Sequence, residues 1–176
     1  MRTAGKNKRR IPEFTSESER SSFYRNEALH FLDFKMRTEA EIRTHLKEKQ
    51  CPSEVSDEVL DFLKEYHYVD DARYALLYIR QEQELHHRSR KDITTRLLSK
   101  GIDGGLISEA FDENGSDEET ELEMARWHLQ KKTRSEAVQP DKLMAFLERK
   151  GFSYRTIKAA LQEFADSESA WLDDSI

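Results

Sequence analysis

The sequence predicts an all-α fold: an elongated tandem array of three three-helix repeats, about nine helices in helix-turn-helix-like units. Three observations lead to this prediction. Of the 176 residues, 36% are apolar and 36% are charged, so much of the chain must be solvated rather than packed in a thick core. Six Gly, three Pro and the lack of sustained apolar–polar alternation argue against β structure. A short motif also recurs at a nearly constant spacing.

The recurring motif occurs three times, as HLKEKQC, RLLSKGI and FLERKGF, starting at residues 45, 96 and 146. In each copy a leucine lies three residues before a lysine, and the leucines are separated by steps of 51 and 50 residues: Leu46, Leu97 and Leu147. A period near 50 residues is typical of tandem helical repeats, in which neighbouring units bury part of their apolar faces against each other. The expected boundaries are 22–67, 68–115 and 116–166.

The first repeat contains signals for three helices. Thr38 and Glu41 form a capping box that opens the second helix, Cys51-Pro52 ends it, and Ser53 is expected to cap the third. Apolar residues at helical spacing mark the three helices in turn: Ala28, Phe31 and Leu32; Ile42 and Leu46; Val55, Val59, Phe62, Leu63 and Tyr66.

The second and third repeats show the same order of signals. Their second helices end at Gly101 and Gly151, because glycine tolerates the left-handed conformation that follows a helix. Ser116 and Glu119 are expected to form a capping box, and Pro140 fits the first turn of a helix. The apolar positions are Ala75, Leu76 and Ile79; Ile93 and Leu97; Leu106, Ile107, Ala110 and Phe111; Leu122, Ala125 and Leu129; Leu143 and Leu147; Ile157, Leu161 and Phe164.

Both ends of the chain are expected to be tails. Residues 1–21 are basic and polar with almost no apolar periodicity, and residues 167–176 are acidic. A single cysteine, Cys51, excludes an internal disulfide and every multi-cysteine metal site. No apolar window reaches the roughly 18 residues of a membrane helix, and the N-terminus lacks the apolar region of a signal peptide. We therefore expect a cytoplasmic protein without membrane contact.

Two adjacent carboxylates, Asp70 and Asp71, precede the apolar run of the second repeat and have three interpretations: a metal site, a catalytic acid pair or a helix cap. The start of a helix favours carboxylates, because its backbone N–H groups lack partners and its dipole is positive there. A metal site needs converging ligands, and only His67 is near in sequence. The cap is therefore favoured, and its loss would cost about 1 kcal/mol.

The same stretch resembles a known family. EYHYVDDARYALLYIR is similar to the Gly-Tyr-Leu-Asp-Asp-x-Arg-Phe-Ala signature of the RecX family of bacterial regulatory proteins, and RTEAEIRTHLKEK resembles that family's first-unit motif. The signature residues are Tyr68, Asp70, Asp71, Arg73 and Ala75, which the resemblance implies are structural. DITTRLLSKGI and LMAFLERKGF resemble the second and third units. The likeness extends from about Tyr24 to Phe164.

The chain departs from the family pattern at three turns. His67 and Gln50-Cys51 stand where glycine is usual, and Ser89-Arg90 replaces a common Gly-Pro. We expect left-handed residues at Gln50 and His67 and a cap at Ser89.

The resemblance implies a regulator, not an enzyme. RecX-like proteins bind RecA and its filament on single-stranded DNA and generally restrain its ATPase, strand-exchange and co-protease activities. The implied protein is a monomer that needs no cofactor, holds no metal and has weak direct DNA contact at most. Two alternatives stay open: a helix-turn-helix protein that binds DNA directly, against which the net charge of -6 counts, and a helical-repeat scaffold for another protein.

Basic clusters are the candidate contact sites, because Lys and Arg neutralise phosphates or meet acidic protein surfaces. An ordinary solvated face is the competing interpretation for each residue. Trp127 is expected to pack beside the apolar stripe of its helix rather than stack on a base, and His86-His87 to lie in a solvated loop. The expected basic face comprises Arg88, Arg90, Lys91, Arg96, Lys100, Lys131, Lys132, Arg134, Arg149, Lys150 and Arg155.

Overall fold

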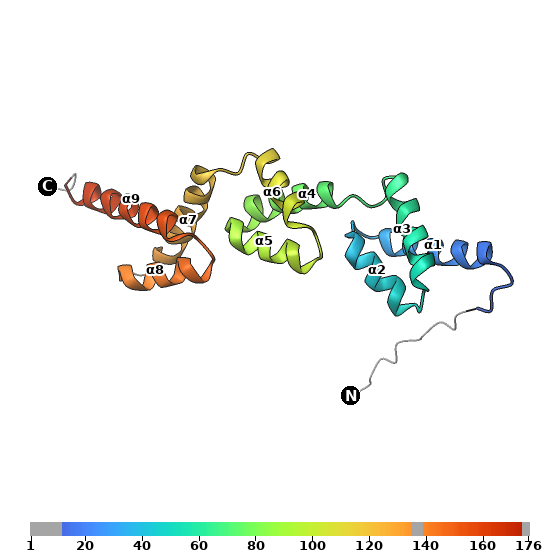
Figure 1. Ribbon diagram of the computed structural model, residues 1–176. Helices are drawn as coiled ribbons and strands as arrows, with labels where there is room; N and C mark the ends of the chain where they lie inside the picture. Colours follow the sequence, from blue (N-terminus) through green and yellow to red (C-terminus); the bar gives the residue numbers. More distant parts are fainter. Residues whose placement is uncertain (1–11, 135–138, 174–176) are drawn as a thin grey trace, which may run out of the picture. The chain divides into compact units, whose positions relative to one another are not determined.

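The computed structural model describes residues 12–134 and 139–173, with side chains described through residue 166. These residues form nine α-helices and no β-strand, and the helices are grouped in threes along the chain (Figure 1). The all-α prediction is confirmed. The helices are α1 (Glu17–Leu32), α2 (Glu39–Glu48), α3 (Ser53–Glu65), α4 (Asp71–His86), α5 (Arg90–Ser99), α6 (Gly104–Glu113), α7 (Glu118–Thr133), α8 (Pro140–Arg149) and α9 (Tyr154–Asp173).

Each group of three helices has a core of its own. The chain divides after Asp70 into two units, the first holding α1–α3 and the second α4–α9. Within the second unit, α4–α6 and α7–α9 bury separate apolar clusters. The most deeply buried large side chains of the three cores are, in order, Tyr24, Ile42, Leu46, Leu60 and Leu63; Ile79, Ile93, Leu97 and Phe111; and Leu129, Leu147 and Ile157.

The recurring motif forms the same helix-ending turn in all three groups. In the first copy the N–H of Cys51 donates to the carbonyl of Leu46, and the N–H of Gln50 donates to that of Lys47. This is the Schellman pattern, in which a left-handed residue lets the backbone return to the last turn. Ile102 and Phe152 repeat the first bond to Leu97 and Leu147. In each copy the backbone carbonyl of the leucine accepts the bond that closes the turn, and the leucine side chain is buried in the core.

Among the described residues, three other than glycine adopt the left-handed conformation. Gln50 has φ 60° and His67 has φ 57°, as expected for turns where the family usually has glycine. His87, with φ 50°, was not anticipated. It lies just before Ser89, so the linker between α4 and α5 also needs a left-handed residue. A side chain in this region costs roughly 1–2 kcal/mol, which neighbouring contacts must offset.

Most predicted helix starts are confirmed, and two are wrong. Thr38 and Glu41 form the capping box of α2, and Ser89 caps α5 by accepting from the N–H of Asp92. Ser53 is the first residue of α3 rather than its cap, a position that Pro52 occupies. The cap of α7 is Asp117, not Ser116: the Asp117 carboxylate accepts from the N–H of Thr120, whereas the Ser116 hydroxyl donates to Gln83 on α4.

Both predicted tails are shorter than expected. Helix α1 begins at Glu17, so a tail through residue 21 is wrong for residues 17–21. Ser16 accepts from the N–H of Glu19, a pattern that apolar periodicity does not reveal. Helix α9 continues to Asp173, so the predicted acidic tail is wrong for residues 167–173. Of the other predicted tail residues, 1–11 and 174–176 lie outside the described chain.

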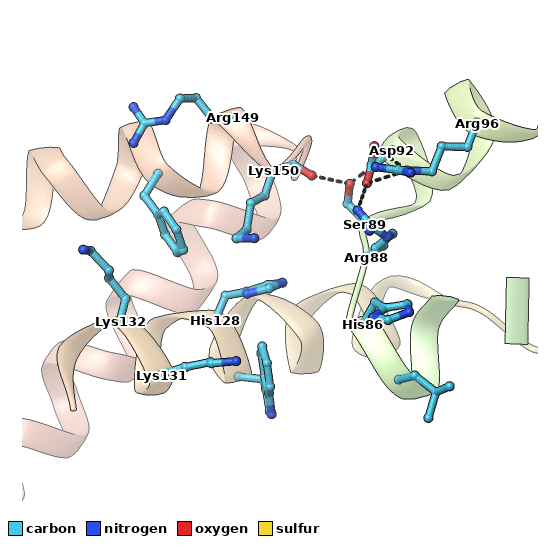
Figure 2. A pocket seen from close by; sticks show the side chains of 13 residues that line it. His86, Arg88, Ser89, Asp92, Arg96, His128, Lys131, Lys132, Arg149 and Lys150 are labelled. Carbon is cyan, nitrogen blue, oxygen red and sulfur yellow. Dashed lines mark hydrogen bonds and ion pairs between the residues drawn. The ribbon is translucent and has the colours of Figure 1, made fainter. Parts of the chain in front are cut away.

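The linker between α4 and α5 is hydrogen-bonded to the third helix group. The buried Ser89 donates its hydroxyl to the carbonyl of Lys150 at 2.7 Å (Figure 2). His128 donates Nε2–H to the carbonyl of His87 at 2.9 Å. The carboxylate of Glu121 accepts from the N–H of Arg90 at 2.5 Å. These three bonds connect residues 87–90 to α7 and α8 and hold the two helix groups of the second unit together.

Gly151 lies against this linker, which makes it sensitive to any side chain. Its φ is +87°, and a Cβ atom would lie 2.8 Å from Ser89 Oγ, which cannot rotate away without breaking its bond to Lys150. Gly151→Ala should therefore lower the free energy of unfolding by about 2–3 kcal/mol in denaturant titrations. Gly115→Ala is the matched control, because Gly115 also has positive φ (+69°) but open space around its Cβ position. Gly115→Ala should lower the free energy of unfolding by about 1 kcal/mol less than Gly151→Ala does. Equal losses would contradict the close contact.

His128 should make stability depend on pH. Burial, followed by the positive charge of Lys150, lowers its pKa to about 4, so the folded protein keeps the ring neutral while an unfolded chain protonates it near 6.5. Stability should fall as pH drops from about 6.5 to about 4, by on the order of 3 kcal/mol at most. His128→Gln, which keeps a hydrogen-bond donor but cannot titrate, should flatten this dependence in thermal melts between those pH values. An identical pH profile in the variant would refute the assignment.

Candidate functional site

A hollow of about 630 Å³ lies in the second unit, between the α4–α5 linker and the helices α7 and α8 (Figure 2). It gathers six of the eleven predicted basic residues, whereas Asp92 is the one carboxylate among the described residues that line it. Trp127, Phe146 and His128 supply aromatic rings to the same hollow. The six basic residues are Arg88, Arg96, Lys131, Lys132, Arg149 and Lys150. We call this feature the basic hollow.

Two of these six residues are engaged in ion pairs within the fold. Arg88 Nε pairs with the Glu82 carboxylate, and Arg88 Nη1 lies 2.8 Å from Asp92. Arg96 Nε lies 3.2 Å from the same aspartate. Arg88 therefore links the end of α4 to the start of α5. Its contacts explain how the linker is held in place, and they leave little of its charge for a ligand.

The other four cations contact no carboxylate within the described residues. Lys131 Nζ lies over the Trp127 ring at 4.6 Å from its centre, and Lys150 Nζ lies over Phe146 at 5.3 Å. Lys132 and Arg149 are exposed at the hollow's edge. A cation over an aromatic ring is positioned without being neutralised. The hollow therefore presents a net positive charge to solvent.

Trp127 packs at the contact between the second and third helix groups. Its ring meets the His87 ring edge-on at 4.1 Å between centres. It is half-buried, in agreement with the expectation that it packs rather than lies free. Sequence reasoning missed Phe146 and His128 as parts of the site. A signal existed for Phe146: it precedes Lys150 by four residues, as Trp127 precedes Lys131, and such pairs share a helix face.

The remaining predicted cations do not join the basic hollow. Arg90, Lys91 and Arg155 line a second hollow of about 1180 Å³, which also carries several carboxylates. There Arg155 pairs with Glu118 at 2.7 Å, and Arg90 lies over the Phe111 ring. Lys100 lies over the Tyr74 ring, and Arg134 is exposed after α7. The single basic face expected from sequence is thus divided among several locations.

The five signature residues take different positions. Ala75 is completely buried in the second core, as expected for a structural residue. Asp70 directly precedes α4 and Asp71 is its first residue, the positions where a capping role was predicted. Arg73 is exposed on α4. Tyr68, by contrast, leaves 53% of its surface exposed, so its side chain is not a core element.

Tyr68 belongs to an exposed aromatic cluster in the first unit. Its ring is stacked 6.4 Å from Phe62, which also contacts the ring of Tyr66 at 4.6 Å. The Arg25 guanidinium lies over the Phe62 ring at 4.0 Å, and Tyr66 is 59% exposed. We call these four residues the aromatic cluster. Tyrosine and arginine side chains gathered in this way are typical of protein-binding surfaces.

Several kinds of chemistry find no support in the geometry. No group of three or more His, Cys, Asp or Glu residues is placed to hold a metal ion in the part of the chain that the structure describes. Burial raises the pKa of the Cys51 thiol to about 11, which disfavours a reactive thiolate. Among the described residues, no helix is both long and apolar enough to cross a membrane.

Family models match two of the three helix groups. The model described as RecX, first three-helix domain, matches residues 25–63, and that of the second three-helix domain matches residues 70–110. Two solved structures share the fold. A RecX crystal structure from Lactobacillus salivarius has a TM-score of 0.74 at 24% identity, covering 83% of this chain and 97% of that one. A crystal structure of regulatory protein RecX has a TM-score of 0.71 at 26% identity, covering 81% and 73%.

The relatives found by sequence similarity are also regulatory proteins named RecX. Regulatory protein RecX of Clostridium acetobutylicum is 30% identical over 154 residues, which cover 84% of this chain and 71% of that protein. The Bacillus velezensis protein is 32% identical over 144 residues, covering 78% of this chain and 54% of that protein, so the chain spans about half the length of this relative. Fold, motif order and sequence agree: the chain belongs to the RecX family of regulatory proteins.

Proposed function

We propose that this chain binds RecA and the filament that RecA forms on single-stranded DNA, and that it restrains the filament's ATPase, recombinase and co-protease activities. Membership of the RecX family carries the proposal, since the signature at Tyr68–Ala75 and the three-helix repeats are the features on which the resemblance rests. Control of these activities would in turn regulate DNA repair.

The distribution of side chains supports a partner that is both protein and nucleic acid. The aromatic cluster offers exposed tyrosines of the kind that anchor protein interfaces. The basic hollow offers cations without carboxylate partners among the described residues, and these suit phosphate groups. A nucleoprotein filament presents both kinds of surface. A regulator without catalytic chemistry can act on it by occupying sites that the active filament needs.

The proposal predicts an effect on ATP hydrolysis. Adding this protein to RecA on single-stranded DNA should lower the steady-state rate of ATP hydrolysis in proportion to the protein bound, because binding restrains the active filament. A coupled ATPase assay measures the rate, and co-sedimentation with the filament measures binding. A scaffold for another protein would leave both unchanged, and a helix-turn-helix DNA binder would instead shift duplex DNA in the absence of RecA. Either result would overturn the proposal.

The aromatic cluster should contribute to RecA binding without supporting the fold. Tyr66→Ala with Tyr68→Ala removes two side chains that are each more than half exposed, so the free energy of unfolding should change by less than about 1 kcal/mol. Affinity for DNA-free RecA, measured by surface plasmon resonance, should fall by about tenfold or more.

The control for this variant is Tyr154→Ala, which removes an exposed tyrosine at the start of α9. Its affinity for RecA should match that of the unmodified protein. Unchanged affinity in the Tyr66/Tyr68 variant would remove the aromatic cluster from the interface.

A further inference from the structure

The basic hollow differs from an ordinary charged helix face in how its cations are held. Solvated lysines are usually mobile and sit beside carboxylates on the same helix. Here the ammonium groups of Lys131 and Lys150 are placed over aromatic rings, and Lys132 and Arg149 border the same concave space. Arg88 and Arg96 occupy the Asp92 carboxylate, so it does not neutralise these four. The charge is therefore both concentrated and positioned in advance.

We infer that the basic hollow binds the phosphodiester backbone of single-stranded nucleic acid through Lys131, Lys132, Arg149 and Lys150. This inference deepens the proposed function, because it assigns this surface to the DNA strand of the filament rather than to the recombinase. Binding to bare nucleic acid does not itself depend on that function.

The local electrostatics agree with an anion site. After burial, the charge of Lys150 is the largest cause that lowers the pKa of His128, which lines the hollow, and Lys131 adds to the effect. The neutral imidazole adds no charge of its own, and its Nε2–H is already donated to the carbonyl of His87. The electrostatic potential is thus positive even at the buried His128 ring, where water and salt screen charges weakly.

A nucleic-acid strand fits the hollow better than an acidic protein segment. The planar Arg149 guanidinium can engage two oxygens of one phosphate, and the lysines can contact its neighbours as point charges. Half-buried Trp127 and Phe146 give the hollow aromatic walls, a common partner of basic residues in single-strand binding sites. An acidic peptide would use the same charges but would gain nothing from these walls.

The hollow can be tested without RecA. Fluorescence anisotropy of a labelled oligo(dT) should report binding by the full chain at about 50 mM salt, weakening steeply towards about 200 mM. Lys132→Glu with Arg149→Glu should weaken binding by about tenfold or more, and should reduce the slope of log affinity against log salt by about 1.4, or about 0.7 for each lost phosphate contact. Both residues are exposed, so circular dichroism should show an unchanged fold.

The matched control is Lys35→Glu with Lys158→Glu. It makes the same change in net charge at two exposed residues outside the hollow, and it should bind nearly as the unmodified protein does. In a Trp171→Phe background, Trp127 is the one remaining tryptophan, and oligo(dT) should change its fluorescence.

Three results would overturn the inference: no binding of oligo(dT) at low salt, equal weakening by the two double variants, or competition by poly-glutamate as effective as that by oligo(dT) at equal charge. The last result would assign the hollow to acidic protein surfaces. If oligo(dT) binds through the hollow but the protein leaves RecA ATPase unchanged, the phosphate site stands and the proposed function fails.

Discussion

The close approach of the Lys150–Gly151 turn to Ser89 is the contact on which the second unit depends. The last carbonyl groups of α8 have no partner within their helix, and Ser89 donates to one of them while its oxygen also accepts from the first turn of α5. One buried hydroxyl thus joins the end of one helix to the start of another. A side chain at position 151 would separate the two, so glycine is needed there for space as well as for its positive φ.

This contact also creates the basic hollow. Lys150 and Arg149 lie at the end of α8, and Arg88 and Arg96 lie beside Ser89 on the linker and α5, so joining the two helix ends brings cations from two repeats to one place. The hydrogen bonds from His128 to His87 and from Arg90 to Glu121 also hold these two helix groups together. Concentrating like charges is unfavourable, and the fold limits this cost by pairing Arg88 and Arg96 with carboxylates and by setting Lys131 and Lys150 on aromatic rings.

The two proposed contact surfaces lie in different units of the chain. The aromatic cluster belongs to the unit that ends at Asp70, and the basic hollow to the unit that begins at Asp71. The first is suited to protein, because its exposed rings can be buried in a dry interface, and the second to phosphate, because its charges can remain partly hydrated. Under the proposed function, engaging both surfaces at once binds a nucleoprotein filament more tightly than either component alone.

The helices, their order and the threefold repetition could be predicted from the sequence, because apolar spacing, capping residues and left-handed turns act over a few neighbouring residues. The motif around Leu46, Leu97 and Leu147 is an example, since each copy closes its own turn. The local pattern was wrong at Ser116, which resembles a cap but donates its hydroxyl to Gln83, a residue far away in the sequence. Which cations share a surface could not be predicted in this way. Arg88 and Arg90 are close in the sequence yet line different hollows, while Arg96 and Lys150, far apart in the sequence, line the same one. The reason is that long-range packing at Ser89 and Gly151, which no local pattern encodes, sets the direction in which each helix presents its charges.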